Sequence, residues 1–294
     1  MRFDGKMFAA KIEEELKARV EGMRIKPKLT IVMMGEDEGS RIYVAMKKKV
    51  GERVGIGVEV KRVESPEGVR GGLKDAGRDG SLAGLMVQLP LLRSTSLAGQ
   101  VIALTKEETE ETLRLIPLSK DVDGLNPENL ALLQSGEPYS AYGYEGARQA
   151  FVPATVKAVE KILDEAFRYT SKDIDENLKV AVVGAKGMVG RGVAMRMRRF
   201  GMEIGEFESG DDLKELNKYE VVISVVGQAG LINPEMVKDQ VIAIDVGFPQ
   251  GDFDPEVEGK AEFFTPVPGG VGPVTVVSLL ENVVLAVENA EELA

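Results

Sequence analysis

The sequence predicts an α/β protein of two domains, the second a Rossmann-like, doubly wound parallel sheet. Two regions of alternating strand and helix patterns, the second arranged around a glycine-rich turn, lead to this prediction. A stretch rich in glycine, proline and tyrosine over residues 126–153 separates them and is expected to be a loop-rich crossing. We expect a first domain over residues 1–140, completed by a returning C-terminal helix over 275–294, and a second domain over residues 141–274.

The first region begins with a charged amphipathic helix pattern and continues with three mainly apolar runs that are typical of strands. The run over 29–34 resembles parallel strands that are buried on both faces. Pro90 ends the third run, and the hydroxyl of Ser40 is a suitable N-cap for the helix between the first two. The expected elements are a helix over 1–20, strands over 29–34, 58–63 and 84–89, a helix from about 40 and a short helix over 105–115.

The second region repeats strand, turn and helix more regularly. Residues 180–183 have the pattern of a short buried strand, residues 184–190 form a glycine-rich turn, and a helix is expected over 191–200. Further elements at this spacing imply a parallel sheet built from βαβ units. They are a helix over 155–167, strands over 203–207, 221–226 and 241–246, and a helix over 275–287.

The composition excludes several kinds of site. The chain has no cysteine, histidine or tryptophan, which rules out disulfides, thiol nucleophiles, His–Cys zinc sites and Ser-His-Asp triads. Acid–base chemistry must therefore use Lys, Asp, Glu, Tyr or water. The net charge of −11 argues against a nucleic-acid partner. We find no apolar run of membrane-spanning length and no signal-peptide pattern, so we expect a cytoplasmic protein with no membrane partner. No spacing of carboxylates supports a metal site, and we expect none.

The glycine-rich turn over residues 184–190 follows a strand pattern and precedes a helix pattern. Glycines at such a turn let the backbone approach a pyrophosphate, and the helix N-terminus supplies amide donors. The spacing here is G-x-x-G-x-x-G and not the usual G-x-G-x-x-G, so a tight connection between strand and helix without a ligand is the alternative. The later Gly227 favours a nucleotide site. Glu206 or Glu208 could accept the ribose 2′-hydroxyl of NAD, whereas Lys186 could pair with the 2′-phosphate of NADP. A solvated strand end would also explain the glutamates.

Tyr43 and Lys47 are four residues apart on the helix expected from about Ser40. We expect them beside an apolar stripe, at the edge of the buried face. A lysine in that position can have a lowered pKa and exchange protons, whereas the alternative is a surface lysine with only its stem buried. The stripe consists of Ile42, Met46, Val50 and Val54.

Further polar groups stand at an expected strand end and in a turn between elements. Gln88 is at the carboxyl end of its strand, where ligands of α/β sheets collect. Gln88 is the polar residue of an otherwise apolar strand; it is either part of a ligand site or an amide that bonds only to backbone. The segment Lys120-Asp121-Val122-Asp123-Gly124 places two carboxylates in one turn. An Asx-type turn or a helix cap would account for one of these aspartates but not obviously for both.

Together these segments resemble the bifunctional methylenetetrahydrofolate dehydrogenase/cyclohydrolase family over nearly the whole chain. Six motifs occur in the family's order, and the last of them is the most specific. They are YVAMKKK at 43–49, VQLPL at 87–91, KDVDG at 120–124, VISVVG at 222–227, IDVG at 244–247 and PVPGGVGP at 266–273.

The resemblance implies roles for the residues described above. Tyr43 would orient the aminobenzoyl portion of the folate, and Lys47, held by Gln88, would be the acid–base residue of the cyclohydrolase step. Asp123, with Asp121 nearby, would accept hydrogen bonds from the pterin ring. The other implied contacts are Pro268, Gly269 and Gly270 with the substrate, and Gly184, Ala185, Lys186, Gly187, Val189, Gly190, Glu208, Ser209, Gly227 and Gly272 with the cofactor.

The implied activity is oxidation of 5,10-methylenetetrahydrofolate with NADP or NAD, followed by hydrolysis of the methenyl product to 10-formyltetrahydrofolate. Hydride transfer needs positioning more than a base, which suits a protein without histidine, whereas hydrolysis needs a group that shuttles protons. The resemblance also implies a role in one-carbon metabolism and purine biosynthesis, and a homodimer joined through the cofactor domains.

Departures from the family pattern are concentrated in the cofactor half. Where the family usually has Pro-Cys-Thr-Pro-x-Gly, Gly-Arg-Ser, His-Ser and Lys-Pro, this chain has PATVKA at 153–158, GAK at 184–186, ES at 208–209 and QA at 228–229. The alternatives are therefore a monofunctional cyclohydrolase or dehydrogenase acting on a folate-like pterin, or a non-catalytic folate- or nucleotide-binding protein. Retention of Lys47 argues against the non-catalytic alternative.

Overall fold

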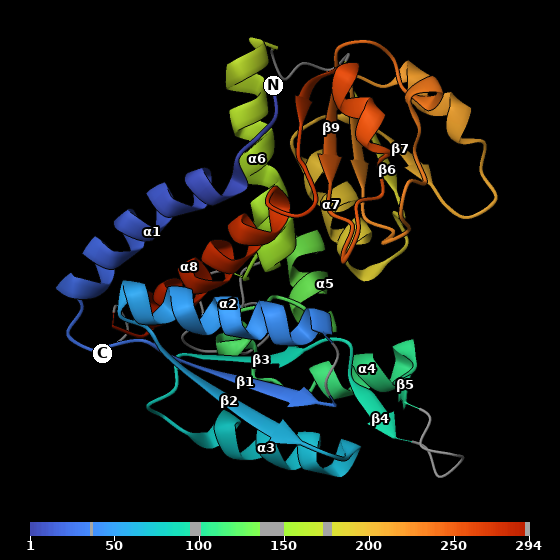
Figure 1. Ribbon diagram of the computed structural model, residues 1–294. Helices are drawn as coiled ribbons and strands as arrows, with labels where there is room; N and C mark the ends of the chain where they lie inside the picture. Colours follow the sequence, from blue (N-terminus) through green and yellow to red (C-terminus); the bar gives the residue numbers. More distant parts are fainter. Residues whose placement is uncertain (36–37, 95–100, 136–149, 173–177, 292–294) are drawn as a thin grey trace. The chain divides into compact units, whose positions relative to one another are not determined.

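The computed structural model describes residues 1–35, 38–94, 101–135, 150–172 and 178–291. The chain forms two compact units (Figure 1). One has a three-stranded sheet and comprises Lys11–Ala154 and Val276–Ala294; the other has a five-stranded sheet and comprises Met1–Ala10 and Thr155–Thr275. We call them the three-stranded unit and the five-stranded unit.

The three-stranded unit is built on parallel strands in the order β2-β1-β3. The central β1 (Lys28–Met34) is buried from its second residue onward, and β3 (Gly84–Gln88) is buried throughout, whereas β2 (Gly57–Val63) is partly exposed at one edge. Figure 1 shows α2 (Glu38–Val54) on one face of the sheet and α3 (Pro66–Arg78) on the other. Because helices cover both faces, the buried strands are continuous apolar runs.

Short elements after β3 lead the chain back alongside that strand. They are β4 (Leu92–Ser94), β5 (Val101–Ala103), α4 (Lys106–Leu113), η1 (Leu118–Lys120) and α5 (Pro127–Ser135). β4 and β5 pair antiparallel, and a capping box between Thr105 and Glu108 starts α4. Asp121 forms a parallel bridge with Leu85 of β3, so the segment after η1 runs beside β3 towards the carboxyl ends of the strands.

Two long helices, α1 (Gly5–Gly22) and α8 (Val271–Glu291), complete the three-stranded unit with most of their length. Arg19 and Glu288 join them through an ion pair of 2.7 Å, and the predicted return of the C-terminal helix is confirmed. By length and composition alone α8 could span a membrane, so the expectation that no segment reaches that length is wrong. However, 67% of its most apolar stretch is buried inside the protein, where its apolar residues form core.

The five-stranded unit has parallel strands in the order β10-β9-β8-β6-β7. The chain passes from β6 to β7 on one side and then to β8 on the other, so the connection after β6 lies at a topological switch point, where such sheets bind ligands. The strands are β6 (Lys179–Val183), β7 (Glu203–Phe207), β8 (Val221–Ser224), β9 (Val241–Asp245) and β10 (Ala261–Phe264). The helices are α6 (Ala154–Thr170), α7 (Met188–Arg199), η3 (Leu213–Lys218), η4 (Pro234–Met236) and η5 (Pro255–Gly259).

The predicted α/β class and doubly wound second sheet are confirmed, and the predicted strands lie within two residues of the observed ones. The sequence did not predict α3, the β4–β5 pair, α5 or β10. α5 falls within the predicted loop-rich crossing, so that prediction is wrong for residues 127–135; residues 136–149 lie outside the described part of the chain. Residues 1–10 group with the five-stranded unit, and the boundary lies after residue 154 and not after 140.

One predicted helix start also differs. α2 begins at Glu38, so Ser40 lies inside the helix and is not its N-cap. The Ser40 hydroxyl instead donates to the Leu89 carbonyl at 3.5 Å. This contact joins the first turn of α2 to the end of β3.

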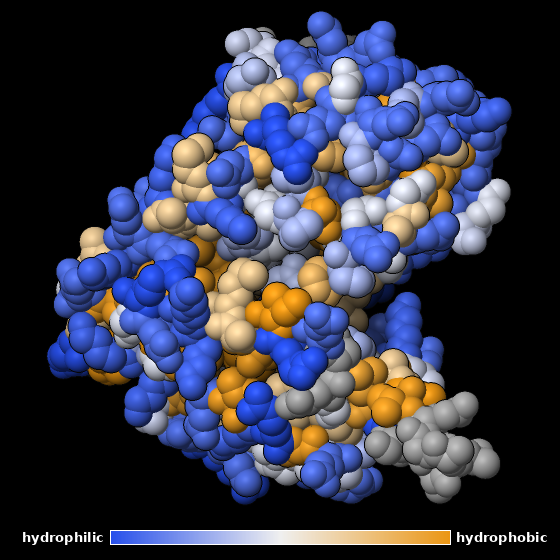
Figure 2. Space-filling model, viewed as in Figure 1, coloured by the Kyte–Doolittle hydropathy of each residue, from blue (hydrophilic) through white to orange (hydrophobic). Residues whose placement is uncertain are grey.

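Hydrophobic side chains are exposed in small groups on the face shown in Figure 2, which is otherwise mainly hydrophilic. Scattered exposure of this kind is normal for a folded chain. The large hydrophobic residues that are exposed are Met1, Met7, Ile25, Ile42, Val101, Ile102, Tyr169, Phe200, Val226 and Phe248.

Candidate active site

Lys47 lies on the buried face of α2, with 6% of its surface exposed. That face is formed by Ser40, Val44, Lys47, Val50, Gly51 and Val54. A Cβ on Gly51 would lie 2.5 Å from the Val58 side chain, so glycine allows α2 to approach β2 closely and fixes which side of the helix is covered. Ile42 is 48% exposed, so the predicted apolar stripe is wrong at its first residue, and Lys47 is more deeply buried than the predicted edge position.

The Lys47 amine is held by side chains of β3. Its Nζ donates to Gln88 Oε1 at 2.9 Å and lies 3.6 Å from Met86 Sδ. Gln88 Nε2 donates to the Leu89 carbonyl at 2.9 Å, which orients the amide so that its oxygen faces Lys47. Gln88 therefore does not bond only to backbone. Burial lowers the pKa of Lys47, and the negative charge of Asp123 partly offsets that effect.

The two aspartates of residues 120–124 have different surroundings. Asp121 is fully buried, its Oδ2 accepts a hydrogen bond from the Asn126 backbone N–H at 3.0 Å, and burial raises its pKa to about 7. It therefore forms the turn that the sequence offered as one interpretation. Asp123 is partly exposed. Burial raises the pKa of its carboxyl, and the positive charge of Lys47 offsets part of that increase. Asp123 is thus the aspartate that can both reach a ligand and act on Lys47.

Tyr43 is half-buried, one helical turn before Lys47 on α2, and burial raises the pKa of its hydroxyl. The ends of α2 and β3 and the segment beside β3 thus supply a phenol, an amine, an amide and a carboxylate. An amine with a lowered pKa can accept and return a proton near neutral pH, and the carboxylate can bind donors of a ligand. The arrangement is suited to proton transfer at a bound polar ring.

The glycine-rich turn of the five-stranded unit follows β6. Gly184 has a positive φ of 83°, and Gly187 is the N-cap of α7. A Cβ on Gly190 would lie 2.1 Å from the Gly184 carbonyl oxygen, so only glycine permits this packing of turn and helix. α7 begins at Met188, three residues earlier than predicted, so Val189 and Gly190 belong to its first turn. Free amides of a first helical turn are suited to a phosphate group.

Glu208 and Glu206 differ in what their carboxylates contact. The Lys186 backbone N–H donates to the Glu208 carboxylate, which places Glu208 against the glycine-rich turn just after β7 ends. Glu206 forms an ion pair of 2.6 Å with Arg198 of α7. The Glu208 backbone N–H donates to Asp211 at 2.7 Å, which fixes the chain that carries it. Glu208 is therefore the acidic side chain that lies against the glycine-rich turn.

Two buried aspartates that the sequence reasoning did not select shape the loop after β8, which contains Gly227. Asp252 accepts hydrogen bonds from the Ser224 hydroxyl and from the backbone N–H groups of Val226 and Gln228, at 2.7–2.8 Å. Asp245 accepts from the Asp252 backbone N–H at 3.1 Å, and burial raises its pKa to about 6. The sequence signal that could have identified Asp245 is its position as the polar last residue of the apolar strand β9.

The remaining predicted contacts lie between β10 and α8 in the five-stranded unit. Gly269 has a positive φ of 105°, and its carbonyl accepts from the Gly5 N–H at 2.9 Å. A Cβ on Gly270 would lie 2.6 Å from the Pro266 carbonyl oxygen. Pro268 is exposed, and Gly272 is in the first turn of α8. Ser209 and Lys186 are exposed beside the glycine-rich turn, and Ala185 is buried within it. Among the described residues, no group of acidic side chains is suited to a metal ion.

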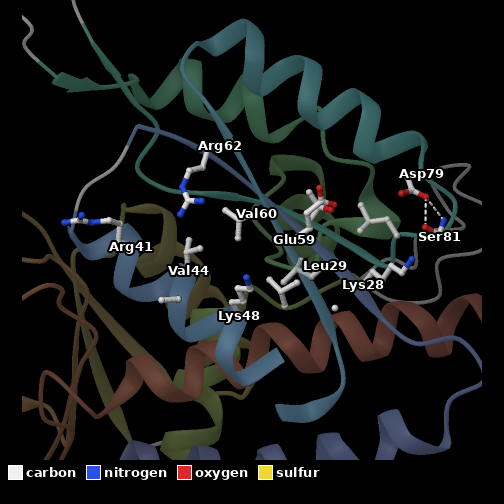
Figure 3. Close-up of a pocket in the computed structure, with 15 residues that line it drawn as sticks. Lys28, Leu29, Arg41, Val44, Lys48, Glu59, Val60, Arg62, Asp79 and Ser81 are labelled. Carbon is white, nitrogen blue, oxygen red and sulfur yellow. Dashed lines mark hydrogen bonds between the residues drawn. The ribbon is translucent and has the colours of Figure 1, made fainter. Parts of the chain in front are cut away.

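A groove of about 770 Å³ lies on another flank of α2, against β2. Figure 3 shows Arg41 and Lys48 of α2 and Arg62 of β2 among the residues that line it. Neither Lys47 nor Gln88 is part of its lining. The groove is therefore separate from the proton-transfer groups, which we identify by their chemistry and hydrogen bonds.

Two family models match the chain. The catalytic domain of tetrahydrofolate dehydrogenase/cyclohydrolase matches residues 3–123, and the NAD(P)-binding domain of tetrahydrofolate dehydrogenase/cyclohydrolase matches residues 153–291. The proteins called bifunctional protein FolD are similar over nearly their whole length. That of Thermotoga maritima is 35% identical over 298 residues, covering 98% of each chain, and that of Nautilia profundicola is 33% identical over 304 residues, covering 97% of this chain and 96% of the relative.

Solved structures give the same result. The bifunctional enzyme FolD of Campylobacter jejuni has a TM-score of 0.81 at 31% identity, covering 98% of this chain and 99% of that one. The methylenetetrahydrofolate dehydrogenase-cyclohydrolase of Trypanosoma brucei, solved with NADP and an inhibitor, has a TM-score of 0.81 at 25% identity, covering 99% and 98%. The likeness therefore extends over both units.

Proposed function

Because the chain belongs to the tetrahydrofolate dehydrogenase/cyclohydrolase family, we propose that it oxidises 5,10-methylenetetrahydrofolate and then hydrolyses the methenyl product to 10-formyltetrahydrofolate. The observation that carries the second activity is the buried Lys47 amine, held at 2.9 Å by Gln88. A lysine that only formed part of a binding surface would not need to be desolvated. The acid–base roles of Lys47, Gln88, Tyr43 and Asp123 are part of this proposal.

For the oxidation, a bound nicotinamide would supply the hydride acceptor, and the protein's task would be to position the reactants. The residues present fit such a cofactor, because Gly184, Gly187 and Gly190 leave the backbone of the turn without side chains at three positions beside the first turn of α7. The hydrogen bonds of Asp252 hold the loop that carries Gly227. Asp123 would hold the pterin ring, and Tyr43 would contact the aminobenzoyl group.

In the hydrolysis, neutral Lys47 would accept a proton from water as the oxygen attacks the methenyl carbon. The protonated amine would then return that proton to N5 while the bond between this carbon and N5 breaks. The second proton of the attacking water leaves to solvent as the formyl carbonyl forms, so one proton is released overall. Gln88 Oε1 accepts a hydrogen bond from the amine and keeps Nζ in one place.

We propose that NAD is the preferred cofactor. The Glu208 carboxylate, fixed by the Lys186 backbone N–H, is in position to accept the ribose 2′-hydroxyl, whereas the 2′-phosphate of NADP would meet this carboxylate and the nearby Asp211. Lys186 could offset the repulsion only in part. We expect kcat/KM to be at least about tenfold higher with NAD, a difference of about 1.4 kcal/mol. The Glu208→Ser variant should lose this preference, whereas Glu206→Ser, which removes the partner of Arg198, should keep it.

The test of both activities is to supply 5,10-methylenetetrahydrofolate with NAD or NADP and follow reduced nicotinamide and methenyl product by absorbance. Lys47→Met should reduce the cofactor but accumulate methenyl product that the parent clears. Lys48→Met is the matched control, because the same change is made at an exposed position on the next flank of α2. Hydrolysis without oxidation would indicate a monofunctional cyclohydrolase, and no turnover of either substrate would overturn the proposal.

We also propose, on family membership, a cytoplasmic homodimer that acts in one-carbon metabolism and supplies purine biosynthesis. The absence of cysteine is compatible with a reducing compartment but does not require one. Sedimentation velocity tests the dimer: a sedimentation coefficient that matches one chain at micromolar concentration would contradict it.

A further inference from the structure

We propose that Asn282 of the C-terminal helix is a positioning residue that fixes the place of Asp123 relative to Lys47. Asn282 lies in the part of α8 that belongs to the three-stranded unit, and 1% of its surface is exposed. Its neighbours Leu280, Val283 and Val284 are fully buried apolar residues. An amide in such surroundings costs stability unless its polar atoms are paired, so its partners indicate what it is for.

Asn282 bonds to the backbone on two separate segments. Its Nδ2 donates to the Val122 carbonyl at 2.8 Å and to the Val152 carbonyl at 2.9 Å. Val122 immediately precedes Asp123, and the Ala154 N–H donates to the Asp123 carbonyl at 3.2 Å. One side chain therefore joins the segment that carries Asp123 to the segment that runs beside it.

Asn129 of α5 forms the corresponding bridge on the other side of Asp123. Its Nδ2 donates to the carbonyls of Gly124 at 3.2 Å and Phe151 at 2.7 Å, and its Oδ1 accepts from the Phe151 N–H at 3.1 Å. The residues on either side of Asp123 are thus held by buried amides: Asn282 bonds to Val122, and Asn129 bonds to Gly124. Asn282 comes from the far end of the chain. Neither asparagine has a role in the family resemblance described above.

The position of Asp123 has two effects on the proposed chemistry, and the proposal rests on that function. Its carboxylate would bind the pterin, and its charge supports the protonated form of Lys47. Loss of Asn282 would leave the buried Val122 carbonyl and the partly buried Val152 carbonyl without this donor and let the Val122–Asp123 backbone move. Displacement of a binding group by about 1 Å can lower a rate about a hundredfold. The expected result is weaker folate binding together with a Lys47 that loses its proton at lower pH.

The test compares Asn282→Leu, which keeps the size but removes the donors, with Ser278→Ala. Ser278 lies one turn earlier on α8, is fully buried, and its hydroxyl has no hydrogen-bond partner in the described structure. We expect Asn282→Leu to lower kcat/KM for the folate about ten- to a hundredfold in both reactions, mainly through KM, and to move the acidic limb of the hydrolysis pH profile to lower pH. Ser278→Ala should change neither.

A second variant, Asn282→Ser, covers the case in which the leucine does not fold, because it is small and polar but its single O–H donor cannot replace both hydrogen bonds of the amide. Normal KM and pH profile in Asn282→Ser, or in a folded Asn282→Leu with a lower melting temperature, would show a merely structural role and overturn the proposal. The pH dependence of Lys47 acylation by an amine-reactive reagent, read by peptide mass spectrometry, needs no turnover. It separates failure of this inference from failure of the proposed enzyme activity.

Discussion

Replacing Lys47 by methionine exchanges a buried amine for a thioether of similar length and volume. Lys47 is 6% exposed, and its ammonium group has three donors. Among the described residues it bonds to one strong acceptor, Gln88 Oε1 at 2.9 Å, and to the weaker Met86 Sδ at 3.6 Å. This incomplete pairing is the physical reason why burial lowers the pKa of Lys47. The native protein therefore holds this amine at a cost in stability.

The expected change in stability combines two opposing contributions. Removing a desolvated charge recovers several kcal/mol. Leaving Gln88 Oε1 without its donor costs about 1–3 kcal/mol, and leaving Asp123 without the nearby positive charge offsets a further part of the gain. We therefore expect Lys47→Met to raise the free energy of unfolding at pH 7 by about 1–2 kcal/mol. With about 2–4 °C per kcal/mol for a domain of this size, the melting temperature should rise by about 2–8 °C. The same variant should hydrolyse methenyl substrate about 10²–10⁴-fold more slowly.

The pH dependence follows from the direction of the pKa shift. The folded-state pKa of Lys47 lies below the ordinary lysine value of about 10.4, so between these two values the unfolded chain binds more protons than the folded one. The stability of the parent should therefore rise with pH across this window. The advantage of Lys47→Met should be largest below the folded pKa and fade towards pH 10.4. Asp123 contributes separately: its pKa is raised above the ordinary value of 3.8 by burial, so stability falls as pH rises through that pKa.

Thermal and urea unfolding from pH 6 to 10, on parent, Lys47→Met and the exposed control Lys48→Met, checks this reasoning. Lys48→Met should stay within about 0.5 kcal/mol of the parent at every pH. Two results would show that Lys47 is not held at a cost in stability. One is a Lys47→Met protein less stable than the parent at pH 7; the other is a difference in the free energy of unfolding between variant and parent that is the same at pH 7 and pH 10.

Three further predictions concern the five-stranded unit. Gly190→Ala should abolish cofactor reduction and leave hydrolysis of supplied methenyl substrate intact, because its Cβ would lie 2.1 Å from the Gly184 carbonyl oxygen; equal oxidation by the variant would contradict this. Asp252→Asn should lower the free energy of unfolding by about 1.5–3 kcal/mol and raise KM for the nicotinamide, since the carboxylate holds three donors of the β8 loop; unchanged KM would refute the link to the cofactor. Asp245 has a pKa raised to about 6, so stability is lost as pH rises through 6, and Asp245→Asn should remove that part of the pH dependence in unfolding experiments from pH 4 to 8.

The strands could be predicted because each buried strand is a continuous apolar run, and that pattern is local. α3 was missed although Val69, Leu73 and Ala76 stand at helical spacing, because four glycines among its thirteen residues lower its helix propensity. Two local signals for its start were nevertheless present: Ser65 accepts from the Gly68 N–H as an N-cap, and Pro66 occupies the first turn. β10, only four residues long, carries no pattern that distinguishes it from a loop.

The candidate site was predictable in its residues and not in its depth. The sequence singled out Tyr43 and Lys47 on one helix, Gln88 at a strand end and Asp123 in a turn. The structure brings Lys47 onto Gln88. The burial of Lys47 depends on how closely α2 lies on β2 at Gly51, which is a property of the packed fold. The different surroundings of the two aspartates, one fully buried and bonded to backbone and the other partly exposed, also required coordinates, because both occur in the same short segment.

The hydrogen bond between Asn282 and Val122 joins residues 160 positions apart, and it has a consequence for synthesis on the ribosome. At about 5–20 residues per second, the segment that carries Asp123 emerges about 8–32 s before the helix that fastens it. During that interval the strands of the five-stranded sheet, which are contiguous in the chain, are completed first. The three-stranded unit meanwhile exposes the apolar surface that α8 will cover. We therefore expect nascent chains that stop before residue 276 to be captured by chaperones and degraded more readily than the full chain.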